Sequence, residues 1–380
     1  MREIINEMRR LLQEQDGGAL VTITRTTGST YRREGAKMLC RKDGSVVGSV
    51  SGGCLEGDIA EVSFEVVEKN QPQILTYDTS SENEKVWGLG LGCNGTVEVL
   101  IEPLQWWREP AGRDQFEEIL ERVKKGRRCA VATVLSEGGK PLPSLRRVIV
   151  EPGGNTVGSL GVPGLESAVS QRACSILKEQ TIRPSRRVTV EREGASFEVF
   201  IDALVPPMRL LVVGGGHDAI PLVKLAHEVG MMVTLIDSRP KFATHERFPQ
   251  ADEIICAQPE EMLRKVPIEG ETAIILMNHN YQKDRVVMSQ ILTTPAEFAY
   301  IGALGPRVRT EQMLDELKKE GLKLQPEKLA AIRTPVGLDI GSDTPEEIAL
   351  AVLAELYMVK NRRSGLPLRD KKAPIHAAAR

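Results

Sequence analysis

The chain has 380 residues and a formal net charge of −2, and only 4% of its residues are aromatic. This length suits two or three domains, and the near-neutral charge and scarce aromatics argue against a nucleic-acid-binding surface. No apolar run approaches the roughly 20 residues that a membrane span needs, and the N-terminal stretch lacks the apolar core of a signal peptide. We therefore expect a cytoplasmic α/β protein that binds neither nucleic acid nor membrane.

The first half of the chain contains the same order of predicted elements twice. Copy 1 reads as a helix over 3–15, a strand from 19, the segment VVGSVSGGCLEGDIAEVSFEVV and the strand GTVEVLIEPL. Copy 2 reads as a helix over 115–125, a strand from 130, TVGSLGVPGLESAVSQRACSIL and ASFEVFIDAL. We interpret residues 1–105 and 106–207 as a duplicated α/β unit with a degenerate second copy, whose strands form one sheet or two related sheets. The alternative is chance similarity between two ordinary α/β units.

Aligning the copies separates shared residues from residues that occur in one copy only. Glu56 and Glu166 are equivalent, so part of the role of Glu56 is expected to be structural, such as capping the following helix. Other positions differ in kind: Cys54 faces Gly164, Gly52 faces Val162, and Cys93 faces Glu193. Residues found only in copy 1 are therefore the better functional candidates.

The segment TTGSTYRREGAKM, residues 26–38, joins two predicted strands of copy 1. Gly28 and Gly35 permit turns, while Ser29, Arg32 and Arg33 supply a hydroxyl and two guanidinium groups. Such a loop suits an anionic, oxygen-rich ligand such as a phosphate, which guanidinium groups bind through paired hydrogen bonds. A solvated basic hairpin is the alternative interpretation.

Cysteine usage gives the second candidate feature of copy 1. None of the six cysteines forms a C-x-x-C pair, which argues against a zinc ribbon or iron–sulfur cluster, and without an export signal we expect reduced thiols. Cys54 follows Gly52 and Gly53 just before a predicted helix, where outward backbone amides attract anions and favour a thiolate. Cys93 is also flanked by glycines, which let another group approach the backbone. We predict Cys54 and Cys93 as reactive thiols of a shared site; the alternative for each is a small buried residue.

Residues 208–365 follow a different pattern, before a tail over 366–380. The apolar strand RLLVV precedes Gly214 and Gly216 in a G-x-G-x-x-A arrangement, and after a helix a second strand ends at Asp237. This order predicts a Rossmann-like doubly wound parallel sheet, with the glycine loop on a phosphate and Asp237 on a ribose hydroxyl.

Further polar residues follow the predicted strands of this region. The C-terminal ends of parallel strands share one edge of a sheet, so we expect these residues to gather beside Asp237 at a ligand site. The candidates are His217, His279, Asp284, Gly305 and Arg307. The alternative for His279 is that it merely caps a loop.

Several of these stretches resemble the xanthine dehydrogenase accessory family, called XdhC/CoxI. GSTYRREGAKM, VSGGCLEGDI and GLGCNGTVEVLIEP are similar to its N-terminal motifs. VVGGGHDAIPLVKLAHEVGMMVTLIDSRP, MNHNYQKD, YIGALGPRVR and PVGLDIGSDTPEEIALAVLAEL are similar to its Rossmann domain. The resemblance implies a chaperone that binds molybdenum cofactor, a pterin with a phosphate and a dithiolene-bound metal. It also implies that the chaperone helps to sulfurate the cofactor and insert it into xanthine dehydrogenase or a related molybdenum hydroxylase of purine catabolism.

On this resemblance, the Arg32 and Arg33 loop, Gly52–Cys54 and Glu56 belong to the site that holds the cofactor phosphate. Cys54 or Cys93 contacts the molybdenum or passes sulfur, with Cys54 as the expected metal contact. The implied partners are the molybdenum hydroxylase, a cysteine desulfurase and a second copy of the chain.

Two other functions stay open at this point. One is an NAD(P)-dependent oxidoreductase, in which NAD(P) or another nucleotide occupies the Rossmann domain. His217 and the stretch Asn278–Asn280, where the family more often has Thr-His-Asp, argue against classical hydride chemistry. The other is a non-catalytic subunit of a xanthine dehydrogenase complex. We do not expect xanthine dehydrogenase catalysis within this chain, which has no iron–sulfur cysteine spacing and is too short for the large molybdenum domain.

Overall fold

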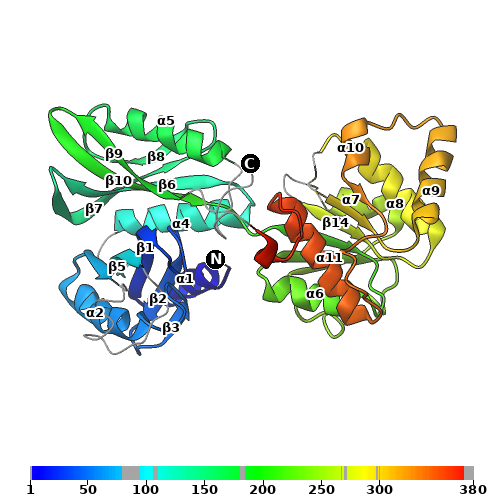
Figure 1. Ribbon diagram of the computed structural model, residues 1–380, viewed down its shortest axis with the longest axis horizontal. Coiled ribbons are helices and arrows are strands. Elements are labelled where there is room, and N and C mark those ends of the chain that lie inside the picture. Colours follow the sequence, from blue (N-terminus) through cyan, green and yellow to red (C-terminus); the bar gives the residue numbers. More distant parts are fainter. Residues whose placement is uncertain are drawn as a thin grey trace. The chain divides into compact units, whose positions relative to one another are not determined.

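Figure 1 shows the computed structural model of the chain, which consists of two compact units. The units are Met1–Pro206 and Pro207–Arg380, and each is described here by itself. The structure describes residues 2–78, 95–105, 110–179, 185–266, 268, 272–296, 298 and 300–371. The predicted thiol Cys93 therefore lies outside the described residues.

The first unit contains two five-stranded antiparallel sheets with the same strand order. The first sheet is β3-β2-β1-β5-β4 and the second is β8-β7-β6-β10-β9. The first sheet consists of β1 (Gly18–Gly28), β2 (Lys37–Arg41), β3 (Val46–Gly48), β4 (Gln73–Asp78) and β5 (Gly95–Leu104). The second consists of β6 (Cys129–Glu137), β7 (Lys140–Val150), β8 (Thr156–Ser159), β9 (Arg186–Arg192) and β10 (Ala195–Leu204). Of the two arrangements expected from the sequence, the pair of related sheets is the one observed.

The likeness of the two copies extends to single residue pairs. Thr22 of β1 pairs with Lys37 and Leu100, and Thr133 of β6 pairs with Arg147 and Phe200. The register then shifts at the same place in both central strands, between Ile23 and Arg25 and between Val134 and Ser136. An extra residue in a strand bends it locally and needs its own accommodation, so the same irregularity in both copies supports duplication over chance similarity.

A shared apolar core joins the two copies. Helices α1 (Arg2–Glu14) and α4 (Pro110–Lys124) pack between the sheets, with Leu11 and Phe116 buried beside residues of both. Helix α2 (Glu56–Lys69) covers the outer face of the first sheet, and α5 (Leu165–Lys178) covers that of the second (Figure 1). The apolar residues of α1 recur at helical spacing, so this helix has one buried face. Each sheet is thus buried on both faces only when both copies are present.

The second unit has the predicted doubly wound parallel sheet, in the order β13-β12-β11-β14-β15-β16. Its strands are β11 (Arg209–Val213), β12 (Met232–Asp237), β13 (Glu253–Cys256), β14 (Ala273–Leu276), β15 (Tyr300–Ala303) and β16 (Ile332–Arg333). In chain order this is 3-2-1-4-5-6, the Rossmann arrangement, whose reversal point lies between β11 and β14. The prediction of a Rossmann-like fold is confirmed.

Helices cover both faces of this sheet. Helices α6 (Ala219–Glu228) and α11 (Pro345–Lys360) pack on one face. The other face carries α7 (Met262–Lys265), α8 (Tyr281–Thr293) and α9 (Arg307–Lys319). The short elements are α10 (Pro326–Ala330), η1 (Pro259–Glu261) and η2 (Leu368–Asp370). Among the described helices, none combines the length and the apolar character needed to cross a membrane.

Candidate functional site

The segment between β3 and α2 folds around the carboxylate of Glu56, and we call residues 49–56 the Glu56 loop. Oε1 of Glu56 accepts hydrogen bonds from the backbone amides of Val50 (3.2 Å), Ser51 (2.9 Å) and Gly52 (3.2 Å). Oε2 accepts from the amides of Gly53 (2.9 Å) and Leu55 (3.2 Å), and the hydroxyls of Ser49 and Ser51 also donate to the carboxylate. Partial burial would raise the pKa of Glu56, but the bonds from Ser51 and its neighbours lower it to about 2. Glu56 is therefore ionised and holds the loop together.

This geometry corrects one expectation. The amides around Gly52 and Gly53 were expected to face an external anion, whereas they face a carboxylate of the same chain. Glu56 also does not cap the following helix in the usual way, because α2 begins at Glu56 itself and Leu55 makes no side-chain cap bond. A phosphate could use these amides only by displacing an ionised carboxylate that already satisfies them.

Copy 2 repeats the arrangement in residues 159–166, the Glu166 loop. Glu166 accepts hydrogen bonds from the Ser159 hydroxyl (2.8 Å) and the amides of Leu160 (2.8 Å) and Gly161 (3.2 Å). Burial opposes ionisation here too, and the bonds from Ser159 and the amides lower the pKa of Glu166. A glutamate that does the same in both copies has a structural role.

The tip of the Glu56 loop carries Cys54, which is exposed together with Gly52 and Gly53. The two glycines have φ angles of 89° and 114°, a region that side chains disfavour, so the tip depends on them. Cys40 and Cys129 differ from Cys54, since both are buried, and burial raises the pKa of each thiol, that of Cys129 to about 12. Cys54 is thus the exposed thiol of the described part of copy 1.

The basic loop, residues 29–36, lies beside this tip. The Tyr31 ring packs on Gly52 so closely that a Cβ at Gly52 would lie 3.0 Å from a ring carbon. Arg33 donates to the Thr26 hydroxyl (3.3 Å), and Thr26 in turn donates from its amide to Glu34 (2.7 Å). The structure thus brings together the two copy 1 motifs that the sequence singled out. Gly28 and Ser29 are exposed at the end of β1.

A polar cavity of about 290 Å³ opens next to the basic loop. Copy 1 lines it with Arg32, Glu34, Gly35, Lys37 and Ser49, and copy 2 contributes Ser185 and Asp202. Among the described residues, no carboxylate forms an ion pair with Arg32, and its Nε has no hydrogen-bond partner. The contribution of copy 2 to this cavity was not predicted from the sequence. The available signal was an acid at the same place in two apolar strands, Glu102 in IEPL and Asp202 in IDAL.

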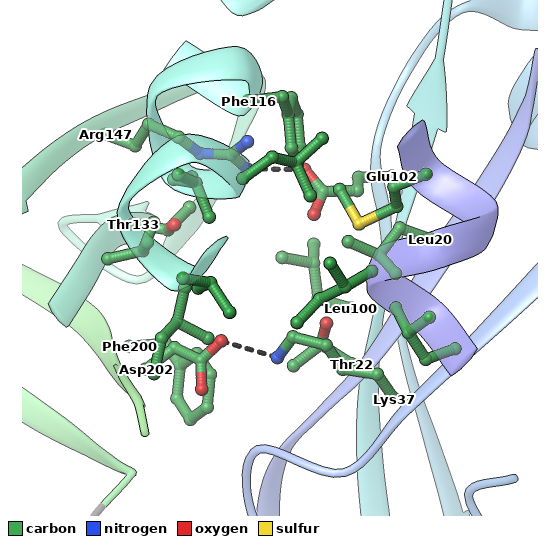
Figure 2. A pocket seen from close by; sticks show the side chains of 18 of the residues that line it. Leu20, Thr22, Lys37, Leu100, Glu102, Phe116, Thr133, Arg147, Phe200 and Asp202 are labelled. Carbon is green, nitrogen blue, oxygen red and sulfur yellow. Dashed lines mark hydrogen bonds and ion pairs between the residues drawn. The ribbon is translucent and has the colours of Figure 1, made fainter. Parts of the chain in front are cut away.

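A smaller apolar cavity of about 60 Å³ lies between the two copies, as Figure 2 shows. Two ion pairs border it: Lys37 bonds to Asp202, and Arg147 bonds to Glu102 (Figure 2). Lys37 and Arg147 occupy equivalent positions, as do Asp202 and Glu102, so the two pairs are related by the internal symmetry. All four side chains are at most 11% exposed. Lys37 and Asp202 also reach the polar cavity, whereas Arg147 and Glu102 do not line it.

The glycine loop of the second unit packs closely, as its sequence predicts. Gly214 has φ 113°, and a Cβ there would lie 2.8 Å from the carbonyl carbon of Met277, so only glycine fits. Gly216 is buried next to His279, whose Nε2 would be 3.4 Å from a Cβ at that position. This places the loops after β11 and β14 together at the edge where a parallel sheet binds ligands.

Asp237 stands in a different environment from the one expected. It is 1% exposed, and its carboxylate accepts bonds from the Gly215 amide (2.7 Å), the Arg239 amide (2.8 Å) and the Arg239 side chain (2.7 and 3.0 Å). Burial would raise its pKa, but Arg239 and the amides lower it. These oxygens already have partners, so the expected contact with a ribose hydroxyl is not available without a rearrangement of Arg239.

The remaining candidates of this edge differ in their exposure. His217, His279 and Arg307 are exposed, and His279 Nε2 lies 3.7 Å from Asp218 Oδ2. Asp284 is 1% exposed, forms an ion pair with Arg309 (2.8 Å) and has its pKa raised by burial. Its role is therefore structural, and it is not open to a ligand. Gly305 has φ 108° just before α9. The cap of α8 is Asn280, whose side chain accepts the Lys283 amide, rather than His279.

The expected metal contact was Cys54, with Cys93, which lies outside the described residues, as the alternative. Within the described ranges, no three side chains of His, Cys, Asp or Glu gather as they would to hold an ion. Cys54 therefore offers a metal a single soft ligand, which suits contact with a metal that arrives already ligated more than capture of a free ion.

These features define a class of protein: a duplicated antiparallel half that carries an exposed thiol at Cys54, followed by a Rossmann unit. The model of the XdhC and CoxI family matches residues 11–78 and 122–190, one stretch in each copy, and the XdhC Rossmann domain matches residues 210–356. A Bacillus subtilis (strain 168) protein, named as a probable subunit of xanthine dehydrogenase, is 30% identical over 93% of this chain and 96% of its own length. The chain belongs to the XdhC and CoxI family, as its motifs predicted.

Two further relatives extend the comparison. The molybdenum cofactor insertion chaperone PaoD of Escherichia coli (strain K12) is 23% identical over 94% of this chain and 88% of its own length. A crystal structure from Bacillus halodurans, described as a xanthine dehydrogenase, is 30% identical and covers 95% of this chain and 96% of its own, with a TM-score of 0.74. The likeness to both proteins therefore covers the two units of the chain and not one domain alone.

Proposed function

We propose that this protein is a molybdenum cofactor chaperone, which binds the cofactor as cargo and delivers it to a molybdenum hydroxylase such as xanthine dehydrogenase. The observation that carries this proposal is the likeness to PaoD along nearly the whole chain, within a family that also includes a protein named for its place in xanthine dehydrogenase. The cysteine spacing, which contains no C-x-x-C pair, fits a carrier better than a hydroxylase with iron–sulfur clusters.

Two residues of copy 1, the exposed Cys54 and the half-buried Arg32, suit such a cargo. A thiol is a soft ligand that matches molybdenum and sulfur, and Cys54 stands exposed on a glycine-flanked tip. Arg32 offers a guanidinium group without a carboxylate partner among the described residues, next to the polar cavity. Copy 2 has glycine in place of Cys54, so the two copies differ where the chemistry requires a thiol.

Sulfuration of the cargo is the finer part of the proposal. In this step the Cys54 thiolate attacks the outer sulfur of a persulfide carried by a cysteine desulfurase. A Cys54 persulfide forms and the desulfurase cysteine leaves as a thiolate, so the transfer needs no oxidant or reductant. The exposed position of Cys54 gives a partner enzyme access to the thiol. The target in this proposal is a purine-oxidising hydroxylase in the cytoplasm, and the carrier acts as a homodimer.

The test is co-expression of the chain with the enzymes of cofactor synthesis, followed by measurement of molybdopterin in the purified protein. We expect stoichiometric molybdopterin in the wild type and a clear loss in Cys54→Ala. Cys256→Ala is the matched control, because Cys256 is also exposed but lies in the second unit, and it should retain the cargo. A wild-type protein without molybdopterin would overturn the proposal, and full retention by Cys54→Ala would remove this thiol from it.

A second candidate is a nucleotide-dependent function of the Rossmann unit, favoured by its strand order and by the close-packed Gly214 loop. The engagement of Asp237 by Arg239 weighs against NAD binding through a ribose diol. Titration of the protein with NADH and NADPH in a calorimeter separates the candidates. Binding with turnover of a carbonyl substrate would favour the oxidoreductase.

A further inference from the structure

The polar cavity has a mixed lining that does not suit a simple anion. Three carboxylates, those of Glu3, Glu34 and Asp202, face two cations, Arg32 and Lys37. A phosphate alone would meet more negative than positive charge here, and a cation alone would meet the Arg32 guanidinium. A ligand that presents both hydrogen-bond donors and an anionic group matches the lining better than either.

Several of these groups retain hydrogen-bonding capacity toward the cavity. Oε1 of Glu34 accepts from both the amide and the hydroxyl of Thr26, and no described group bonds to its Oε2. Asp202 accepts from the Ser185 hydroxyl on Oδ1 (2.9 Å) and from Lys37 on Oδ2, and each carboxylate oxygen has a second lone pair. The cavity thus offers two carboxylates as acceptors and Arg32 as a donor.

Asp202 is held in place by residues of both copies. Ser185 donates to its carboxylate and accepts the Ala203 amide (3.1 Å), which fixes the hydroxyl. Gly35 of copy 1 approaches so closely that a Cβ there would lie 2.7 Å from the Ser185 Oγ and 3.2 Å from Asp202 Oδ1. The basic loop of copy 1 is therefore fitted to copy 2 at this point, and the wall of the cavity is incomplete without copy 2.

We propose that the polar cavity between the copies binds the pterin end of the cargo, with Asp202 of copy 2 and Glu34 of copy 1 as acceptors for its ring N–H groups. This inference rests on the proposed function. A pterin has adjacent ring and amino N–H donors, which a carboxylate accepts in pairs, and Arg32 is left for the anionic end of the molecule. Copy 2 is then a working part of the site, although it lacks the exposed thiol and the basic loop of copy 1.

The internal symmetry of the chain provides a matched control. Asp202 and Glu102 each form a buried ion pair across the same interface, but only Asp202 lines the polar cavity. Asp202→Asn and Glu102→Gln remove the same charge with little change in shape, so a general loss of stability should affect both. A loss of ligand binding should affect Asp202→Asn alone.

The experiment titrates the full chain with pterin-6-carboxylate, a fluorescent probe that has the donor edge and an anionic group. We expect binding to the wild type and to Glu102→Gln, and binding weaker by about tenfold or more in Asp202→Asn, since a bond to a charged group is lost. Inorganic phosphate at the same concentration should compete poorly. Equal probe affinity in Asp202→Asn and Glu102→Gln would overturn the inference, as would tighter binding of phosphate than of the probe.

A second variant guards against misfolding of the first. Glu34→Gln does not touch the interface ion pairs, and its carbonyl oxygen can still accept the Thr26 amide, so it should fold normally and bind the probe about tenfold more weakly. The molybdopterin content of the same variants distinguishes the two proposals. Wild-type protein that carries molybdopterin, with equal content in all three variants, would refute the cavity but leave the chaperone function standing. Probe binding that depends on Asp202, in a protein without molybdopterin, would refute the chaperone function and leave the pterin site in the cavity supported.

Discussion

The two copies of the first unit share a scaffold and differ in their loops. Both have the same strand order, the same register shift and a glutamate whose carboxylate accepts hydrogen bonds from the backbone amides of the preceding loop. In copy 2 the first two strands are joined by the tight turn Gly138-Gly139, whereas in copy 1 residues 29–36 form the basic loop that reaches the polar cavity. The comparison teaches that the features retained twice form the scaffold, and that the basic loop and the polar cavity, which belong to one side only, are the place to look for chemistry.

The largest expected effect concerns the two symmetric ion pairs. Lys37→Ala would leave Asp202 buried and unpaired, and Arg147→Ala would do the same to Glu102, so each should lower the free energy of unfolding by about 3 kcal/mol. The measurement is urea unfolding followed by tryptophan fluorescence, because all three tryptophans belong to the first 206 residues. Replacing a whole pair, as in Lys37→Met with Asp202→Leu, should cost much less. A large difference between the stability losses of Lys37→Ala and Arg147→Ala would show that the two ion pairs are not equivalent.

The glutamates of the two loops come next. Glu56→Gln should lower the free energy of unfolding by about 2 kcal/mol, since the pKa of Glu56 falls from an ordinary 4.5 to about 2 in the folded protein. A depressed pKa means that this stability is fully present above pH 4.5 and is lost as the pH falls toward 2. The free energy of unfolding, measured at several pH values over this range, should therefore change less with pH in Glu56→Gln than in the wild type.

Glu166→Gln sharpens the same comparison in copy 2. It should have the same sign and a smaller size, about 1 kcal/mol, because Glu166 accepts fewer amide bonds than Glu56. The same unfolding measurement serves both variants. An unchanged stability in Glu56→Gln together with a loss in Glu166→Gln would show that the loop of copy 1 is held by something other than its carboxylate.

The smallest effect on stability is expected at Cys54. Cys54→Ser should change the free energy of unfolding by less than about 0.5 kcal/mol, because the side chain is exposed. In the native protein a maleimide should label Cys54 well before Cys40 and Cys129, whose thiols are buried and have raised pKa values. Mass spectrometry of the labelled peptides gives the order, and early labelling of Cys40 would contradict the structure.

Much of the fold follows from local sequence pattern. The apolar strands, the glycine loop and the spacing to Asp237 indicated the Rossmann sheet, because they follow one another within a short stretch of chain. The duplication was visible for the same reason, since aligned residues such as Glu56 and Glu166 recur in the same order.

The site depended on contacts that the sequence does not display. The amides near Gly52 turn inward because the φ angles of two glycines direct them to Glu56, and no residue type reveals that direction. Asp237 is taken by Arg239, two residues further along, which the glycine pattern does not predict. Asp202 forms its ion pair with Lys37, which is 165 positions away in the sequence. A short sequence motif cannot predict a contact over that separation, so the position of Asp202 beside the basic loop was not foreseen.

The core formed jointly by α1, α4 and both sheets has a consequence for ancestry and for protein engineering. A one-copy ancestor would have exposed the apolar side of α1 and the inner face of its sheet, and would have needed a second molecule to cover them. Joining two such copies in one chain would replace that concentration-dependent encounter with a tethered one, so that each copy covers the apolar face of the other. For the same reason, a fragment cut after residue 105 is expected to aggregate, whereas residues 1–206 form one compact unit that contains both copies.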